Sequence, residues 1–202
     1  MDNIIFIFTV FGVVSLVSLC IVFLVYWVIP DFNNLHGKIV LGNVVSIFCV
    51  TSFLLTVFNF KLDDKNLCKF IGYFGYISSI SMFSWMTIMC FDLSSTFIRE
   101  EIPHPFNNKL RFVFYSIIGW GSGLVLAMVL LLFEHFLPPD SDFNPAVGTQ
   151  SCFISKKGKT FLYLFHFPIL VMMIINISFF IIVLIFLIKT NVKSSELRIS
   201  RR

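Results

Sequence analysis

Five long runs without Asp, Glu, Lys or Arg constrain this 202-residue chain more than any other feature. Each run exceeds the roughly 20 residues with which a helix crosses the hydrocarbon core of a bilayer. Unpaired backbone groups are costly in lipid, so runs this long and this apolar are expected to be helical. The sequence therefore predicts an all-α, polytopic transmembrane helix bundle with five spans. The runs cover residues 3–30, 39–60, 70–91, 112–133 and 160–188.

The composition agrees with a membrane protein that consists of a single transmembrane domain. Hydrophobic residues make up 57% of the chain and charged residues 13%, whereas about a quarter of a soluble domain is charged. With their flanks included, the spans are predicted at about 3–30, 37–60, 68–97, 111–136 and 161–189. The longest connection, 137–160, contains prolines and is predicted to be an extracellular loop, and 190–202 is predicted to be a basic cytoplasmic tail.

The orientation follows from the distribution of Lys and Arg. The first run starts almost at Met1, no basic residue precedes it and Lys38 follows it, so we expect a retained signal anchor whose N-terminus lies outside. This topology places nine Lys and Arg residues on the cytoplasmic side and six on the other, a mild bias in the direction of the positive-inside rule. The predicted location is the plasma membrane. The net charge of +4 is explained by a basic tail that faces anionic lipid, without a nucleic-acid partner.

The five cysteines separate by depth. Three of them, Cys20, Cys49 and Cys90, lie inside apolar runs, where a thiol behaves as a small hydrophobic group. Cys68 and Cys152 both face the oxidising side under this topology and can form a disulfide. Such a bond would close a segment of about 85 residues and stabilise the fold by a few kcal/mol. Two unrelated surface thiols are the alternative.

Four segments stand out by their order, depth and spacing. They are "LHGKIVLGN" at 35–43, "FSWMTIMCFD" at 83–92, "IIGWGSG" at 117–123 and "SCFISKKGKTFLYLFHFPILVMMIINISFF" at 151–180. Together they resemble the Methuselah-like receptors of insects, within the secretin/adhesion class of G protein-coupled receptors. The resemblance extends over nearly the whole chain.

The resemblance implies roles for individual residues. It matches His36 to the histidine at the inner end of span two, Trp85 and Trp120 to the tryptophans of spans three and four, Pro168 and Asn176 to the proline and asparagine of span five, and Cys68 with Cys152 to the disulfide.

The chain departs from the family pattern in two ways. Much of the wider class has a glutamate about four residues after the tryptophan of span three, but here that position is Met89 and the nearest carboxylate is Asp92. The family also has seven spans and normally an outer ligand-binding domain. We therefore expect the chain to represent spans one to five of an incomplete seven-helix receptor.

The inner end of span three carries a candidate polar cluster. Asp92 lies close to the height of His36 and precedes Arg99, and ionisable groups near a bilayer tend to find partners or water. One hypothesis is that these three residues hold spans two and three in the inactive arrangement. The alternative is a carboxylate that has simply reached the headgroup region.

Further candidates lie deeper in the spans. Serines at 78, 79, 81 and 84 indicate that span three is the buried hub, and Trp85 at mid-depth either packs or forms the floor of a ligand cavity. Gly119 and Gly123 around Trp120 indicate a packing face on span four. Pro168 is expected to kink span five, and Asn176 to hydrogen-bond to another helix.

The functional prediction is a receptor and not an enzyme. Neither a catalytic constellation nor a phosphate-binding loop is evident, and the four histidines fall on different sides or depths, so we predict no metal and no cofactor. The resemblance implies that an extracellular peptide or protein signal activates a heterotrimeric G protein. The alternative is a non-signalling five-span protein that assembles with other membrane proteins, such as other receptor chains.

Overall fold

The computed structural model describes residues 2–32, 34–60, 62–98, 107–138, 141–148, 152–154 and 159–200. The prediction of an all-α transmembrane bundle with five spans is confirmed, because five helices are long and apolar enough to cross a membrane. These helices are α1 (Asp2–Val28), α2 (Leu35–Asn59), α3 (Lys65–Ile98), α4 (Asn108–Phe136) and α5 (Phe167–Ser200). A 3-10 helix, η1 (Pro30–Phe32), follows α1, and a π-helix, η2 (Phe161–His166), leads directly into α5.

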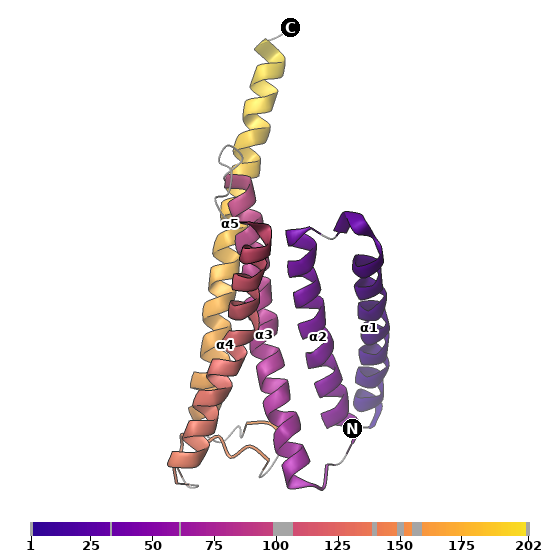
Figure 1. Ribbon diagram of the computed structural model, residues 1–202, viewed down its shortest axis with the longest axis vertical. Helices are drawn as coiled ribbons and strands as arrows, with labels where there is room; N and C mark the ends of the chain where they lie inside the picture. The colour runs from indigo at the N-terminus through magenta and orange to yellow at the C-terminus, as the bar shows by residue number, and fades with distance from the viewer. Residues whose placement is uncertain are drawn as a thin grey trace.

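Helix α3 is the centre of the bundle, as its serine content predicts. It packs against α2, α4 and α5, whereas α1 packs mainly on α2 at the edge (Figure 1). Half of the most apolar window of α3 is buried within the protein, compared with none of the corresponding window of α1. A helix that is hydrophobic all round and packs on only one neighbour, as α1 does, turns most of its surface towards lipid.

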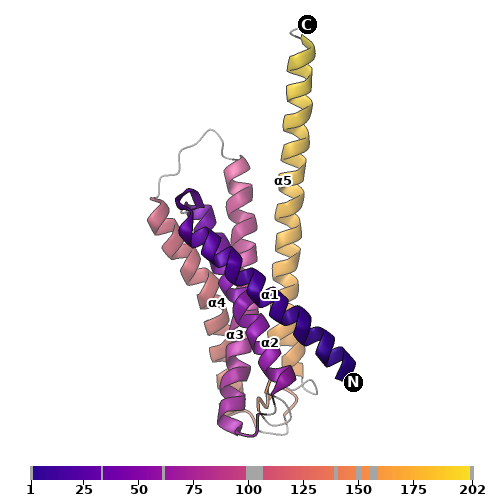
Figure 2. The ribbon, with the colours of Figure 1, turned by 90° about the vertical axis from the view of Figure 1, so that its right-hand side faces the viewer.

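Consecutive helices run in opposite directions, so each end of the bundle collects the starts of some helices and the finishes of others (Figure 1). We call the end where α3 begins the disulfide end, and the end where α3 finishes, near Asp92, the carboxylate end. Helix α1 begins at the disulfide end, and α5 extends far beyond its neighbours at the carboxylate end (Figures 1 and 2). The helix continues to Ser200, well into the segment 190–202 that the sequence analysis predicts as a tail.

Local sequence signals explain where the helices at the carboxylate end begin. The Asn34 side chain accepts a hydrogen bond of 2.7 Å from the Gly37 amide at the start of α2. The Asn107 side chain does the same for the Lys109 amide, at 3.1 Å, at the start of α4. Asparagine favours such caps because its side-chain oxygen satisfies an amide that has no partner within the helix.

Candidate functional site: the two ends of the bundle

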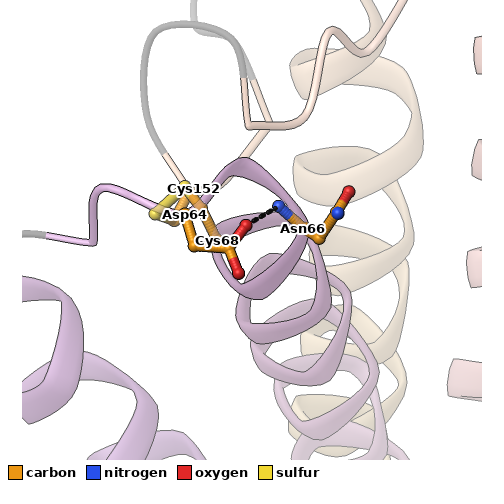
Figure 3. Close-up of a disulfide and its surroundings, with 4 residues drawn as sticks. All are labelled: Asp64, Asn66, Cys68 and Cys152. Carbon is orange, nitrogen blue, oxygen red and sulfur yellow. Dashed lines mark hydrogen bonds between the residues drawn. A yellow bond between two sulfur atoms is a disulfide. The ribbon is translucent and has the colours of Figure 1, made fainter.

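A disulfide between Cys68 and Cys152 ties the loop after α4 to the start of α3 (Figure 3). The two Cα atoms are 4.7 Å apart and the residues are separated by 84 positions in sequence. The Cys68 amide also donates to the Asp64 carbonyl at 2.9 Å, which fixes the first turn of α3. The pairing that the sequence analysis offers is therefore present, and the alternative of two unrelated thiols is wrong.

The tethered loop packs into the bundle. Val147 and Ile154 are almost fully buried and belong to a hydrophobic cluster with Tyr76 and Ile80 of α3 and Leu130 of α4. The loop backbone also approaches α3 closely: a Cβ atom on Gly72 would overlap with the Cys152 carbonyl oxygen. Only a glycine at position 72 leaves room for this approach.

A second polar contact at the disulfide end joins α3 to α4. The Glu134 carboxylate accepts a hydrogen bond from the Tyr73 hydroxyl at 2.5 Å and lies 2.5 Å from the Lys69 ammonium group. The side chain of Glu134 is 17% exposed, so the ion pair is partly shielded from solvent. These three residues are not among the site residues predicted from the sequence.

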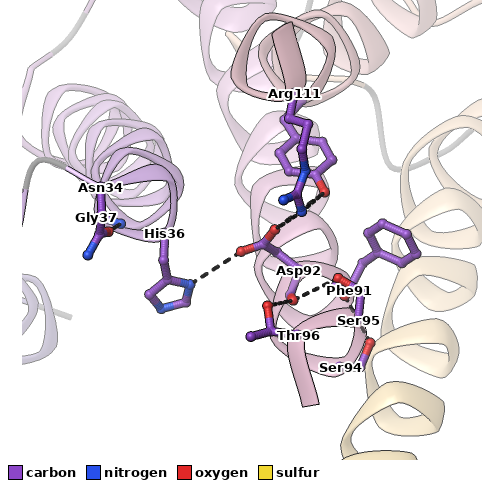
Figure 4. A network of polar contacts seen from close by, with 10 residues as sticks. Asn34, His36, Gly37, Phe91, Asp92, Ser94, Ser95, Thr96 and Arg111 are labelled. Carbon is purple, nitrogen blue, oxygen red and sulfur yellow. Dashed lines mark hydrogen bonds and ion pairs between the residues drawn. The ribbon is translucent and has the colours of Figure 1, made fainter. Parts of the chain in front are cut away.

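At the carboxylate end, the buried side chain of Asp92 joins three helices (Figure 4). Arg111 of α4 donates to its Oδ1 at 2.9 Å, and the Tyr115 hydroxyl, also on α4, donates to the same oxygen at 3.4 Å. His36 of α2 places its Nδ1 3.7 Å from Oδ2. The Asp92 side chain is only 6% exposed, and the desolvation of a buried charge must be offset by partners such as these.

The main partner of Asp92 is therefore Arg111, which the sequence analysis counts only as a basic residue on the cytoplasmic side. The Arg111 side chain is 14% exposed and that of His36 is 47% exposed, so the pair with Arg111 is the better shielded one. Arg99, the third member of the predicted cluster, lies outside the described residues. The sequence does contain a signal for Arg111. Helix α4 begins at the same end of the bundle at which α3 finishes, so the first residues of span four lie near the height of Asp92.

The predicted packing residues lie between α3 and its neighbours. Trp85 is 1% exposed and is held between two glycines: a Cβ atom on Gly42 would lie 2.8 Å from its ring and one on Gly119 2.6 Å from it. Trp120 contacts the same ring edge to face, with centroids 6.2 Å apart. A Cβ atom on Gly123 would lie 2.7 Å from the Ile77 carbonyl. These contacts favour packing over the cavity-floor interpretation of Trp85.

The hydrogen bond predicted for Asn176 is not found among the described residues. Asn176 is 7% exposed, yet neither amide atom has a partner there. Both amide atoms are buried within the bundle, and α5, which carries them, packs mainly on α3. Pro168, where a kink is predicted, lies two residues after the π-helix η2.

Five helices that are long and apolar enough to cross a membrane, packed around a central one, define a multi-pass membrane protein. Its sequence matches the family described as the seven-transmembrane receptor (secretin family) over residues 1–201, and the chain belongs to that family. The Methuselah-like resemblance is also confirmed.

The curated relatives are receptors. The chain is 32% identical over 162 residues to the probable G-protein coupled receptor Mth-like 11 of Drosophila melanogaster, an alignment that covers 77% of the chain and 30% of the relative. It is 27% identical over 176 residues to the G-protein coupled receptor Mth of Drosophila yakuba, with 86% of the chain and 34% of the relative covered. The chain thus spans about a third of the length of the relatives it matches.

Proposed function

We propose that the chain transmits an extracellular signal, a peptide or a protein, to a heterotrimeric G protein across the plasma membrane. Membership of a receptor family supports this proposal, and the relatives reported above are named as G-protein coupled receptors. In this proposal the tethered loop and the disulfide end receive the signal. The carboxylate end and the projecting part of α5 contact the G protein.

The proposed orientation has the N-terminus outside and the C-terminus in the cytoplasm. Disulfides form and persist in oxidising compartments, which favours an extracellular disulfide end. Helix α1 begins at that same end and α5 finishes at the other (Figure 1), in agreement with the positive-inside count. A tag placed before Met1 should be reached by antibody on intact cells. Labelling that requires permeabilisation contradicts the orientation.

The observation that carries the proposal is the buried Asp92 network at the carboxylate end. A signal changes a two-state helix arrangement only if it binds the two states with different affinity. The Asp92 carboxylate contacts residues from α2 and α4, so any movement of these helices relative to α3 must alter its pairing with Arg111 or His36. We propose that the network stabilises the inactive arrangement.

Basal activation of G protein biosensors in cells tests this proposal. Asp92→Asn removes the charge that pairs with Arg111, and we expect it to raise basal activation several-fold at equal surface expression. Asp31→Asn is the matched control, because Asp31 is an exposed carboxylate near the same end of the bundle, in η1. Equal basal activity in the two variants shows that the Asp92 network does not restrain signalling.

A further inference from the structure

The start of α5 lacks one of its own hydrogen bonds. In an α-helix the carbonyl of Leu164 would accept from the amide of residue 168, but Pro168 has no N–H. The helix is also widened here: η2 spans Phe161–His166, and the Phe167 amide donates to the Leu162 carbonyl, five residues back. Such π-helical turns are rare and are found frequently at functional sites.

Tyr76 of α3 supplies the missing donor. Its hydroxyl donates to the Leu164 carbonyl at 2.7 Å, and the tyrosine itself is fully buried. Proline is tolerated in membrane helices where neighbouring groups satisfy the freed backbone atoms. The hydrogen bond that Pro168 removes within α5 is thus replaced by one between α3 and α5.

The disulfide-tethered loop contacts the same segment. The ring of Phe153, next to Cys152, lies 5.2 Å from that of Phe165 and 6.3 Å from that of Phe161, both in η2. Phe165 in turn lies 6.0 Å from the Tyr76 ring. Just before η2, the Thr160 hydroxyl donates to the Phe143 carbonyl of the loop at 2.6 Å. The position of the loop and the geometry of η2 are therefore linked by direct contacts.

We propose that Tyr76 and Phe153 are the positioning residues through which the loop controls the start of α5. Tyr76 holds the widened turn by replacing the donor that Pro168 lacks, and Phe153 packs the loop against that turn. When a signal displaces the loop, η2 loses this packing and the backbone hydrogen bonding at the start of α5 changes. The use of this device in signalling rests on the proposed receptor function, but the contacts themselves do not.

A double-mutant cycle on the purified chain tests the role of Tyr76. Tyr76→Phe removes one buried hydrogen bond and should lower Tm by about 2–4 °C. In a Pro168→Ala background the backbone amide gained at position 168 can donate to the Leu164 carbonyl, so the same substitution should lower Tm much less. Equal losses in the two backgrounds overturn the proposal, because independent sites are additive. Tyr163→Phe, at an exposed tyrosine of η2, is the control and should change Tm in neither background.

Hydrogen exchange of the amides at 161–167 tests the role of Phe153. An aromatic contact of this kind predicts that Phe153→Ala speeds their exchange roughly 2- to 10-fold. The control is Phe60→Ala, at an exposed aromatic residue at the same end of the bundle. Exchange that is equally fast in both variants, or unchanged in Phe153→Ala, overturns the link between loop and turn. Neither experiment needs a G protein, so a failure of the proposed receptor function leaves both results interpretable.

Discussion

The two ends of the bundle hold their helices together by different means. At the disulfide end a covalent bond, a cluster of aromatic rings and a loop packed into the bundle fix the start of α3. At the carboxylate end a buried carboxylate and a hydrophobic cluster of Ile39, Ile88 and Tyr115 hold α2 and α4 against α3, and no disulfide joins the described residues there. The disulfide end is thus tied covalently, whereas the carboxylate end combines apolar packing with charges whose pairing can change.

This difference has a consequence for where the helices can move relative to one another. Packed interfaces resist continuous deformation, so motion is concentrated where a few contacts have two alternative arrangements. The ion pair of Asp92 with Arg111 is where we propose such a change, since the His36 side chain lies beside the other carboxylate oxygen and can take over the charge. The second contact in this proposal is the Tyr76 bond to the Leu164 carbonyl, at the disulfide end. The comparison therefore predicts that loss of the disulfide costs more stability than loss of the Asp92 ion pair.

Loss of the disulfide should have the largest effect. Cys152→Ser leaves the 84-residue segment open, and the chain-entropy account gives a loss of about 3–5 kcal/mol. Thermal unfolding with and without reductant measures it: reductant should lower the Tm of the native chain and leave that of Cys152→Ser unchanged. Cys20→Ala is the control, because this thiol is unpaired and exposed on α1, and it should keep the response to reductant. If native and serine chains unfold at one temperature, the tether does not stabilise the disulfide end.

Breaking the ion pair at the other end should cost less. Asp92→Leu leaves Arg111 shielded and without its carboxylate, for an expected loss of about 2–3 kcal/mol. Replacing both partners, Asp92→Leu with Arg111→Met, should recover most of that loss, since an apolar pair can substitute for a buried ion pair. Thermal unfolding of the two variants decides the point. A double variant less stable than the single one means that Arg111 has other partners that matter more.

The sequence predicts the fold well because membrane insertion imposes a simple rule. Each charge-free run must satisfy its backbone within itself, so the number of helices and their all-α class follow from the position of the charges. The disulfide can also be predicted from the sequence, because the predicted topology places Cys68 and Cys152 on the same side of the membrane. The central position of α3 follows from its serines, which let neighbouring helices approach.

The partners of the polar groups are harder to predict because they depend on helix rotation. Asp92 is predicted to form a polar cluster with His36 and Arg99, whereas its main partner in the structure, Arg111, is not predicted. Height in the membrane is readable from the chain, whereas the face of α4 that turns to α3 is not. The π-helix before Pro168 is missed for a similar reason: a proline predicts a disturbed helix without specifying whether it bends or widens.

The close approach of the loop to α3 provides a more local test of the disulfide end. Gly72→Ala places a methyl group against the Cys152 carbonyl, and overpacking of this kind costs about 1–3 kcal/mol. Gly121→Ala on α4 is the matched control, because its new Cβ would meet no atom within 4 Å; alanine should be neutral or slightly stabilising there. Thermal unfolding should give a lower Tm for Gly72→Ala than for Gly121→Ala. If both behave alike, the loop moves aside freely and the disulfide end is less rigid than its packing indicates.

The smallest effect is expected at Glu134, the partly buried carboxylate of the disulfide end. Tyr73→Phe removes the hydroxyl that donates to Glu134 and leaves the pair with Lys69 in place. Because one partner remains, the loss should be about 0.5–1.5 kcal/mol, below that of Asp92→Leu. Thermal unfolding beside Tyr163→Phe, which keeps an exposed ring and should be neutral, isolates the hydroxyl. A loss as large as that of Asp92→Leu would mean that both ends depend on a carboxylate to the same degree, and that the tether alone distinguishes them.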